Sequence, residues 1–177
     1  MTAPQVEYRA ASGIAAAGRV LSGYAAVYGQ ETRIGRYREV IKQGAFKRTL
    51  SEDRDVLALA DHDQKQVLGR TKSGTLQLRE DPHGLHFTLT LPDTQAGRDV
   101  VTLAQRGDLG GMSFGFIATD EEWHGEVRTL RDVDLHEISV VSAWPAYQQT
   151  ERSLRNKPCE PQVFFSDARR LWLETCD

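Results

Sequence analysis

The chain has 177 residues and a formal net charge of −3, with a mean hydropathy of −0.48. This length suits one domain that can bury its own hydrophobic core without disulfide bonds. The sequence has no block of basic residues that would indicate a nucleic-acid partner, and no apolar run long enough to span a membrane.

The two ends of the chain differ in composition from its middle. Residues 1–19 are rich in Ala, Gly and Ser and lack the pattern of a signal peptide, so we expect a flexible N-terminal arm there. A folded domain is expected over residues 20–150, followed by a polar C-terminal tail over residues 151–177 with a short amphipathic helix. Cys159 and Cys176 lie in this tail, which favours a reducing cytoplasm over a disulfide framework.

The first half of the domain reads mostly as short strands. In chain order, the sequence predicts a strand over residues 20–28, an extended segment over 37–41, a short helix over 44–50 and an apolar strand over 56–60. The apolar strand leads directly into the tripeptide Asp61-His62-Asp63.

The clearest local pattern is a β-hairpin. Leu76 and Leu78 alternate with polar residues, and Asp81-Pro82-His83-Gly84 then gives a type I turn signal. Apolar and polar residues alternate again from Leu85 to Leu91. This pattern predicts two strands with one buried face and one solvated face.

A helix and two strands follow the hairpin. Asp93 or Thr94 can cap a helix that runs to Arg106 and ends at Gly107. A glycine-rich strand is predicted over residues 110–117, a two-residue turn at His124-Gly125, and a final strand over residues 135–141. Strands therefore dominate, which favours a barrel or a sandwich over a doubly wound sheet.

Ser113 is a candidate nucleophile in the glycine-rich strand. Met112, Phe114 and Phe116 share one face by parity, so Ser113 and Gly115 share the other. Neighbouring glycines allow another backbone to approach closely, as the peptide substrate of a protease must. The alternative is an ordinary strand serine beside glycines that permit a bulge.

His62 is a candidate general base. It follows an apolar strand directly, and an imidazole there can exchange protons near neutral pH. The alternatives are a solvated loop histidine or, more weakly, a metal site with Asp61 and Asp63. Adjacent strand residues point in opposite directions, which argues against convergence of all three on one ion.

Glu137 is unexpected in the apolar run from Leu135 to Val141, where it shares parity with Leu135, Ser139 and Val141. A carboxylate in such a strand is costly unless it is paired, and a catalytic imidazole would be a suitable partner. His136 points to the opposite face of the strand, so only one of Glu137 and His136 can face a site that contains His62. The alternative for Glu137 is the exposed side of an edge strand.

Several short motifs occur in a defined order. They are Gly44-Ala45-Phe46 with Thr49-Leu50, Asp61-His62-Asp63 with Leu68-Gly69-Arg70, the Asp81/Gly84-Leu85 hairpin, Ser113-Phe114-Gly115-Phe116, and the run Leu135 to Val141 with Pro145-Ala146. Each motif alone is weak. The ordered set, from about Val20 to about Ala146, resembles the prohead proteases of tailed bacteriophages, a family related to herpesvirus assemblin.

The resemblance implies an α+β, β-dominated fold, namely an antiparallel β-barrel flanked by helices as in assemblin. It implies a serine endopeptidase that cleaves the scaffolding segment of the major capsid protein, and itself, during prohead maturation. The enzyme would act inside the procapsid in the host bacterial cytoplasm. Its partners would be the capsid protein and further copies of itself, with no nucleic acid or membrane involved and with a homodimer left open.

The resemblance also implies roles for individual residues. Ser113 matches the serine motif as nucleophile, His62 the histidine motif as general base, and Glu137 the acidic position that would orient the imidazole. No metal or organic cofactor is implied. Assemblin uses a second histidine as third member, which makes His136 the alternative to Glu137. Its oxyanion donors come from an arginine-bearing loop, and residues 142–147 here contain no arginine.

Two other classes of function compete with the protease. The first is a catalytically inactive capsid-assembly or scaffolding protein with the same fold. The second is a small binding module built on a β-barrel. Self-cleavage that disappears on Ser113→Ala would distinguish the protease from both.

Overall fold

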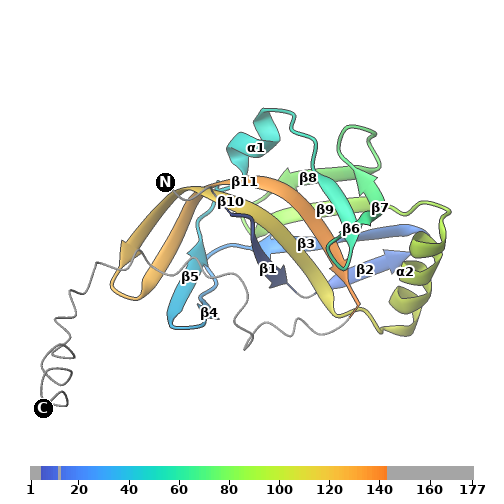
Figure 1. Cartoon of the computed structure of the whole chain (residues 1–177), viewed down its shortest axis with the longest axis horizontal. Helices are drawn as coiled ribbons and strands as arrows, with labels where there is room; N and C mark the ends of the chain where they lie inside the picture. The colour runs from blue at the N-terminus through green and yellow to red at the C-terminus, as the bar shows by residue number, and fades with distance from the viewer. Residues whose placement is uncertain (1–4, 12, 143–177) are drawn as a thin grey trace, which may run out of the picture.

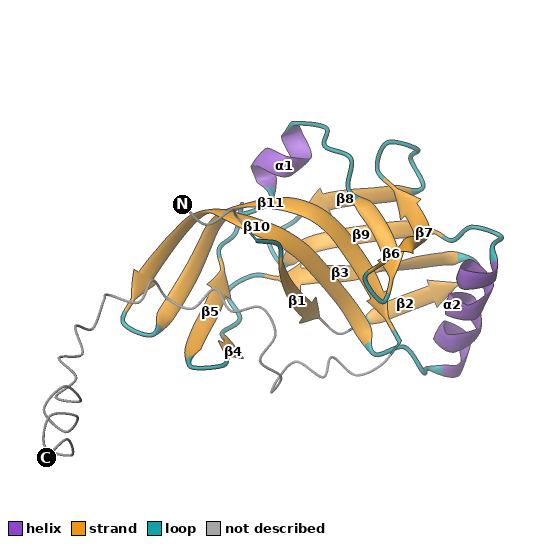
Figure 2. Cartoon of the chain, viewed as in Figure 1, coloured by secondary structure: helices purple, strands orange, loops and turns teal. Residues whose placement is uncertain are grey.

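The computed structural model describes residues 5–11 and 13–142, in which strands dominate (Figures 1 and 2). The strands are β1 (Glu7–Ala11), β2 (Ile14–Ala17), β3 (Val20–Val27), β4 (Thr32–Ile34), β5 (Tyr37–Ile41), β6 (Leu57–Ala60), β7 (Asp63–Arg70), β8 (Leu76–Glu80), β9 (Gly84–Thr90), β10 (Gly111–His124) and β11 (Val127–Val141). The helices are α1 (Lys47–Ser51) and α2 (Gln95–Arg106). Helix α1 contacts β8 and β11, and α2 contacts β2 and β7 at one end of the molecule (Figure 1).

The strands form two sheets. The larger sheet has seven strands, with the order β1-β10-β11-β5-β4 and with β6 joining β11 to β7. The smaller sheet has the order β2-β3-β9-β8. Buried apolar side chains from both sheets form one hydrophobic cluster, which includes Leu21, Phe87 and Leu89 from the smaller sheet and Phe114 and Ile138 from the larger one.

Strand β11 is long enough to pair with two short strands along the same edge. Its first part pairs with β5 at residues 127–130, and its last part pairs with β6 at residues 137–140. Both pairings are parallel, so the larger sheet is mixed. The predicted β-dominated character with a few helices is confirmed, whereas the larger sheet is mixed instead of antiparallel. The pairings of the described residues give two sheets and do not close a barrel.

The alternation predicted for β10 is confirmed. Met112, Phe114 and Phe116 lie in the hydrophobic cluster, whereas Ser113 and Gly115 face away from it. The two faces of this strand therefore separate the packing residues from the candidate nucleophile.

A β-bulge changes the parity predicted for β11. Gly115 pairs with Glu137 and Phe116 pairs with Leu135, so His136 is an extra residue without a partner on β10. Leu135 consequently lies in the hydrophobic cluster with Ile138, and Glu137 faces the other way. The predicted shared parity of Glu137 and Leu135 is wrong, because a bulge shifts the alternation by one residue.

The predicted bounds of α2 and the predicted β8–β9 hairpin agree with the structure. Helix α2 has Thr94 as its N-cap, whose hydroxyl accepts from the amide of Gly97, and it ends at Gly107 with a φ of +74°. The β8–β9 hairpin turns at residues 81–84, where the Asp81 carboxylate accepts from the amides of His83 and Gly84. The β10–β11 turn lies one residue later than predicted, because His124 already pairs with Val127.

The N-terminal segment is not a flexible arm in the described region. Residues 7–11 form β1 at the edge of the larger sheet, and residues 14–17 form β2 at the edge of the smaller one. The composition predicted an arm because residues 1–19 offer little apolar surface for burial. Backbone pairing of β1 with β10 and of β2 with β3 nevertheless orders both segments. The C-terminal tail at 151–177 and its predicted helix lie outside the described residues. Neither α1 nor α2 is long and apolar enough to cross a membrane.

Candidate active site

The candidate residues lie on the outer face of the larger sheet. Across four neighbouring strands, the register aligns Ala10, Ser113, Ser139 and Leu59 in one row. It aligns Tyr8, Gly115, Glu137 and Leu57 in the next row. Residues aligned in this way on one face have Cβ atoms about 5 Å apart, so strands distant in sequence contribute to one small surface.

Ser113 lies between Ala10 and Ser139 in the first row and is only 4% exposed to solvent. Its cross-strand partner is Ser139, which is fully buried. Among the described residues, the Ser113 side chain makes no hydrogen bond. Gly111, two residues before Ser113, adopts a φ of +146°, a backbone conformation that favours glycine.

His62 is held over the sheet by a tight bend after β6. The amide of Asp61 donates to the carbonyl of Val140 at 2.9 Å, which continues the pairing with β11 by one residue. Asp61 and His62 then adopt φ values of +48° and +61°, so both residues have left-handed backbone conformations. Such conformations are costly outside glycine and persist where surrounding contacts enforce them.

The carboxylate of Asp61 makes the contacts that stabilise this bend. Its two oxygens accept from the amide and the hydroxyl of Ser142, both at 2.8 Å. Ser142 directly follows β11, so the bend is attached to the strand that carries Glu137. Asp61 therefore ties the bend that carries His62 to the end of β11.

His62 and Glu137 contact each other directly. The His62 Nδ1 atom lies 2.5 Å from Oε1 of Glu137, although the two residues are separated by 75 positions in the sequence. The second carboxylate oxygen of Glu137 accepts from the Ser139 hydroxyl at 3.2 Å. Both carboxylate oxygens are thus hydrogen-bonded, which offsets the cost of burying Glu137.

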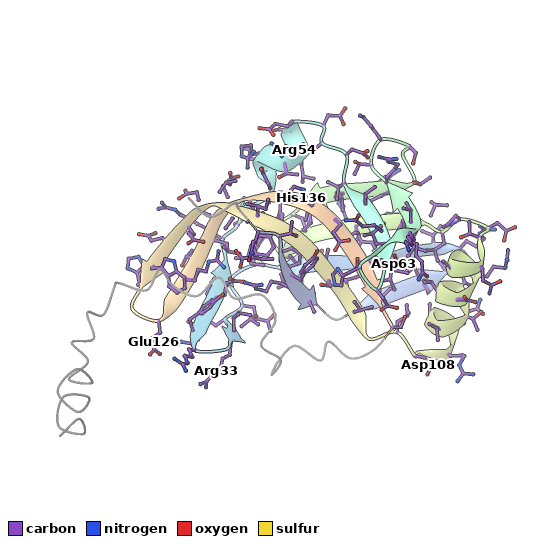
Figure 3. All side chains as sticks on the ribbon, in the orientation of Figure 1. Arg33, Arg54, Asp63, Asp108, Glu126 and His136 are labelled. Atoms are coloured by element: carbon purple, nitrogen blue, oxygen red, sulfur yellow. The ribbon has the colours of Figure 1, made fainter. Side chains whose placement is uncertain are left out.

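The structure separates His136 from this cluster. His136 is the bulged residue of β11, is exposed and makes no hydrogen bond or ion pair among the described residues (Figure 3). The geometry therefore favours Glu137 over His136 as the partner of His62. No hydrogen bond joins His62 to Ser113 in this structure, and Ser113 lies one row away from Glu137 on the same face.

Gly115 leaves a space that the side chains of Glu137 and Tyr8 approach from either side. A Cβ atom at this position would lie 2.9 Å from Cγ of Glu137 and 2.9 Å from Cε1 of Tyr8. Both distances are shorter than ordinary van der Waals contacts, so any side chain here would displace its neighbours. Glycine at this position therefore permits the close approach of these two side chains.

Sequence reasoning missed Tyr8 and the role of Ser139. Tyr8 lies in the segment expected to be an arm, yet its ring packs against His62 with the ring centroids 4.5 Å apart. Burial, and then the negative charge of Glu137, raise the pKa of the Tyr8 phenol. The parity of Ser139 with Glu137 was visible in the sequence, but a hydroxyl-to-carboxylate contact along one strand cannot be inferred from parity alone.

The described residues contain no group of three His, Cys, Asp or Glu side chains placed to hold a metal ion. A serine, a histidine and a buried carboxylate on one sheet face are instead the residue types of serine-dependent hydrolysis.

Comparison with known proteins identifies the family. The sequence matches the family described as caudovirus prohead serine protease over residues 5–162, so the chain belongs to that family. The structure is similar to that of the capsid assembly protease of bacteriophage T4, with a TM-score of 0.57 at 9% sequence identity. The similarity covers 80% of this chain and 99% of that one, and at this identity it shows a shared fold. No match was found among curated protein sequences. The resemblance inferred from the ordered motifs is confirmed.

Proposed function

We propose that this chain is a serine endopeptidase that cleaves the scaffolding segment of the major capsid protein, and itself, during prohead maturation. It would act inside the procapsid, within the host bacterial cytoplasm. The observation that carries the proposal is the hydrogen bond between His62 and Glu137 on the sheet face that also holds Ser113. Membership of the prohead serine protease family supports the choice of reaction and substrate class.

The contact between His62 and Glu137 determines how the imidazole would work. A carboxylate only accepts, so Nδ1–H of His62 donates to Glu137 and the neutral ring keeps its free lone pair on Nε2. That nitrogen is the one available to take a proton from Ser113. The carboxylate then stabilises the imidazolium that forms.

The reaction proceeds in two halves. The Ser113 hydroxyl attacks the scissile carbonyl while His62 takes its proton, and the protonated imidazole then gives this proton to the leaving amine. Water next attacks the acyl-enzyme and loses a proton to His62, which then gives this proton to the Ser113 oxygen as the new carboxylic acid is released. Backbone N–H groups would stabilise the oxyanion in both halves.

Co-expression with the major capsid protein of the same phage tests the proposal. Intact-mass measurement should find defined cleavage products of both proteins with the wild-type enzyme and none with Ser113→Ala. The matched control is Ser22→Ala, a strand serine of the smaller sheet, which should leave the products unchanged. Identical products from Ser113→Ala would exclude this nucleophile. A wild-type chain that yields no products would favour the inactive capsid-assembly protein.

A further inference from the structure

Tyr8 is the aromatic neighbour of His62 on the sheet face of the candidate site. The two rings meet edge to face, with centroids 4.5 Å apart and an interplanar angle of 69°. His62 therefore contacts Tyr8 in addition to its hydrogen bond with Glu137. Contacts of this geometry are directional, so they restrict how an imidazole can rotate.

Tyr8 is fixed by the strand that carries it. Its neighbours Glu7 and Arg9 point to the opposite face of β1 and enter a cluster of buried ion pairs. Arg128 makes two hydrogen bonds to the Glu7 carboxylate, at 2.6 and 2.8 Å, and a third to Glu39 at 2.9 Å. Arg9 reaches the same Glu39 at 2.5 Å. The two residues that flank Tyr8 are thus anchored on one side, which leaves its ring projecting from the other.

Gly115 brings Tyr8 and Glu137 to the same place. It lies between them in the register, and its missing side chain lets both approach to within 2.9 Å of where a Cβ would be. His62 contacts both of these side chains, so Tyr8 and Glu137 together define the position of the imidazole. Tyr8 itself remains 46% exposed, and the phenol is not used by the mechanism above.

We infer that Tyr8 is a positioning residue for His62, and that β1 is thereby part of the active site. The expected effect on catalysis rests on the proposed function. The expected effect on the position of His62 rests on the ring contact. The aromatic ring limits rotation of the imidazole away from its hydrogen bond with Glu137. The hydroxyl is not required for this role, so phenylalanine should replace tyrosine.

The rate at which a small fluorophosphonate phosphonylates Ser113, with loss of fluoride, measures this role without a bound peptide. Tyr8→Ala should slow this phosphonylation about 3- to 10-fold, the change that corresponds to the energy of one aromatic pair, with Tyr8→Phe close to wild type. Tyr24→Ala is the matched control, because Tyr24 makes the same edge contact with His83, also at 4.5 Å. It should leave the phosphonylation rate unchanged.

Peptide kinetics provide the second arm. Tyr8→Ala should lower kcat with little change in KM. A raised KM with a normal rate of phosphonylation by the fluorophosphonate would mean that Tyr8 binds substrate, and the inference would be wrong. Equal losses in Tyr8→Phe and Tyr8→Ala would show that the hydroxyl is needed instead of the ring, which also contradicts the inference.

Nuclear magnetic resonance separates this inference from the proposed function. In the Ser113→Ala chain, Tyr8→Ala should move the ring-proton signals of His62, whereas Tyr24→Ala should move those of His83 and His86. Unchanged His62 signals would overturn the inference. A wild-type chain that never reacts with the fluorophosphonate would overturn the proposed function, and the His62 signals would still decide whether Tyr8 holds the ring.

Discussion

His136 and Glu137 are consecutive residues in β11, but only Glu137 faces the candidate site. The bulge opposite Gly115 leaves His136 unpaired and exposed, while the Glu137 carboxylate is buried and bonded to His62. Bulges redirect side chains in this way beside active sites in many sheets.

This difference predicts unequal effects of two substitutions. Glu137→Gln should reduce kcat by about 10⁴-fold, because an amide at this position disfavours the imidazole tautomer that can act as a base. His136→Ala should change kcat little. Both values come from steady-state cleavage of a peptide that spans a mapped cleavage site. A greater loss in His136→Ala than in Glu137→Gln would reverse the assignment of the third residue.

Gly115→Ala should reduce activity through crowding. The new methyl group would lie 2.9 Å from both Glu137 Cγ and Tyr8 Cε1, and overpacking of this kind typically costs about 1–3 kcal/mol. We expect lower kcat as well as a lower free energy of unfolding, measured by urea denaturation. The substitution should be less harmful in a Tyr8→Ala chain, because one of the two crowded neighbours is then absent. Strict additivity of the two changes would contradict this account.

Asp61→Ala should weaken catalysis by releasing the bend that carries His62. The change removes both hydrogen bonds to Ser142 and places alanine in a left-handed conformation. A misplacement of about 1 Å can cost up to about 10²-fold in rate. Asp63→Ala is the control from the same tripeptide, since among the described residues the Asp63 carboxylate accepts hydrogen bonds only from nearby Lys65 and Gln66. Equal kcat values for the two variants would rule out a special role for Asp61.

The buried ion pair between Glu7 and Arg128 should make stability depend on pH. Burial alone would raise the pKa of Glu7, but the hydrogen bond and charge of Arg128, with help from Arg9, hold it below the ordinary value of 4.5. Because the pKa is depressed in the folded state, this contribution is complete above pH 4.5 and is lost as the pH falls through the folded-state pKa.

Urea unfolding of the Ser113→Ala chain between pH 7 and pH 3 measures this loss. Glu7→Gln should lower the free energy of unfolding at pH 7 and reduce its further decline on acidification. Glu31→Gln is the control, because Glu31 pairs with Arg38 where both side chains are about half exposed. If Glu7→Gln and its parent lose the same free energy on acidification, the ion pair does not contribute as described.

Local features of this protein could be predicted from sequence because their causes lie within a few residues. Thr94 and Gly107 mark the ends of α2 through hydrogen bonds and backbone conformations that neighbouring residues supply. The turn at residues 81–84 and the alternation around Ser113 have equally short range. The ordered motifs around His62, Ser113 and Glu137 carried the family resemblance, because each motif is itself a short contiguous segment.

Only the tertiary structure decided which distant segments meet. Glu7 and Arg128 are 121 residues apart, and their buried contact adds to the backbone pairing with β10 that orders a segment of arm-like composition as β1. The bulge at His136 exists only relative to the partner strand β10, so no pattern within β11 could reveal that Leu135 and Glu137 face opposite sides. The pairing of β5 and β6 with one long strand is likewise a matter of register between separate segments, which hydrophobic periodicity does not encode.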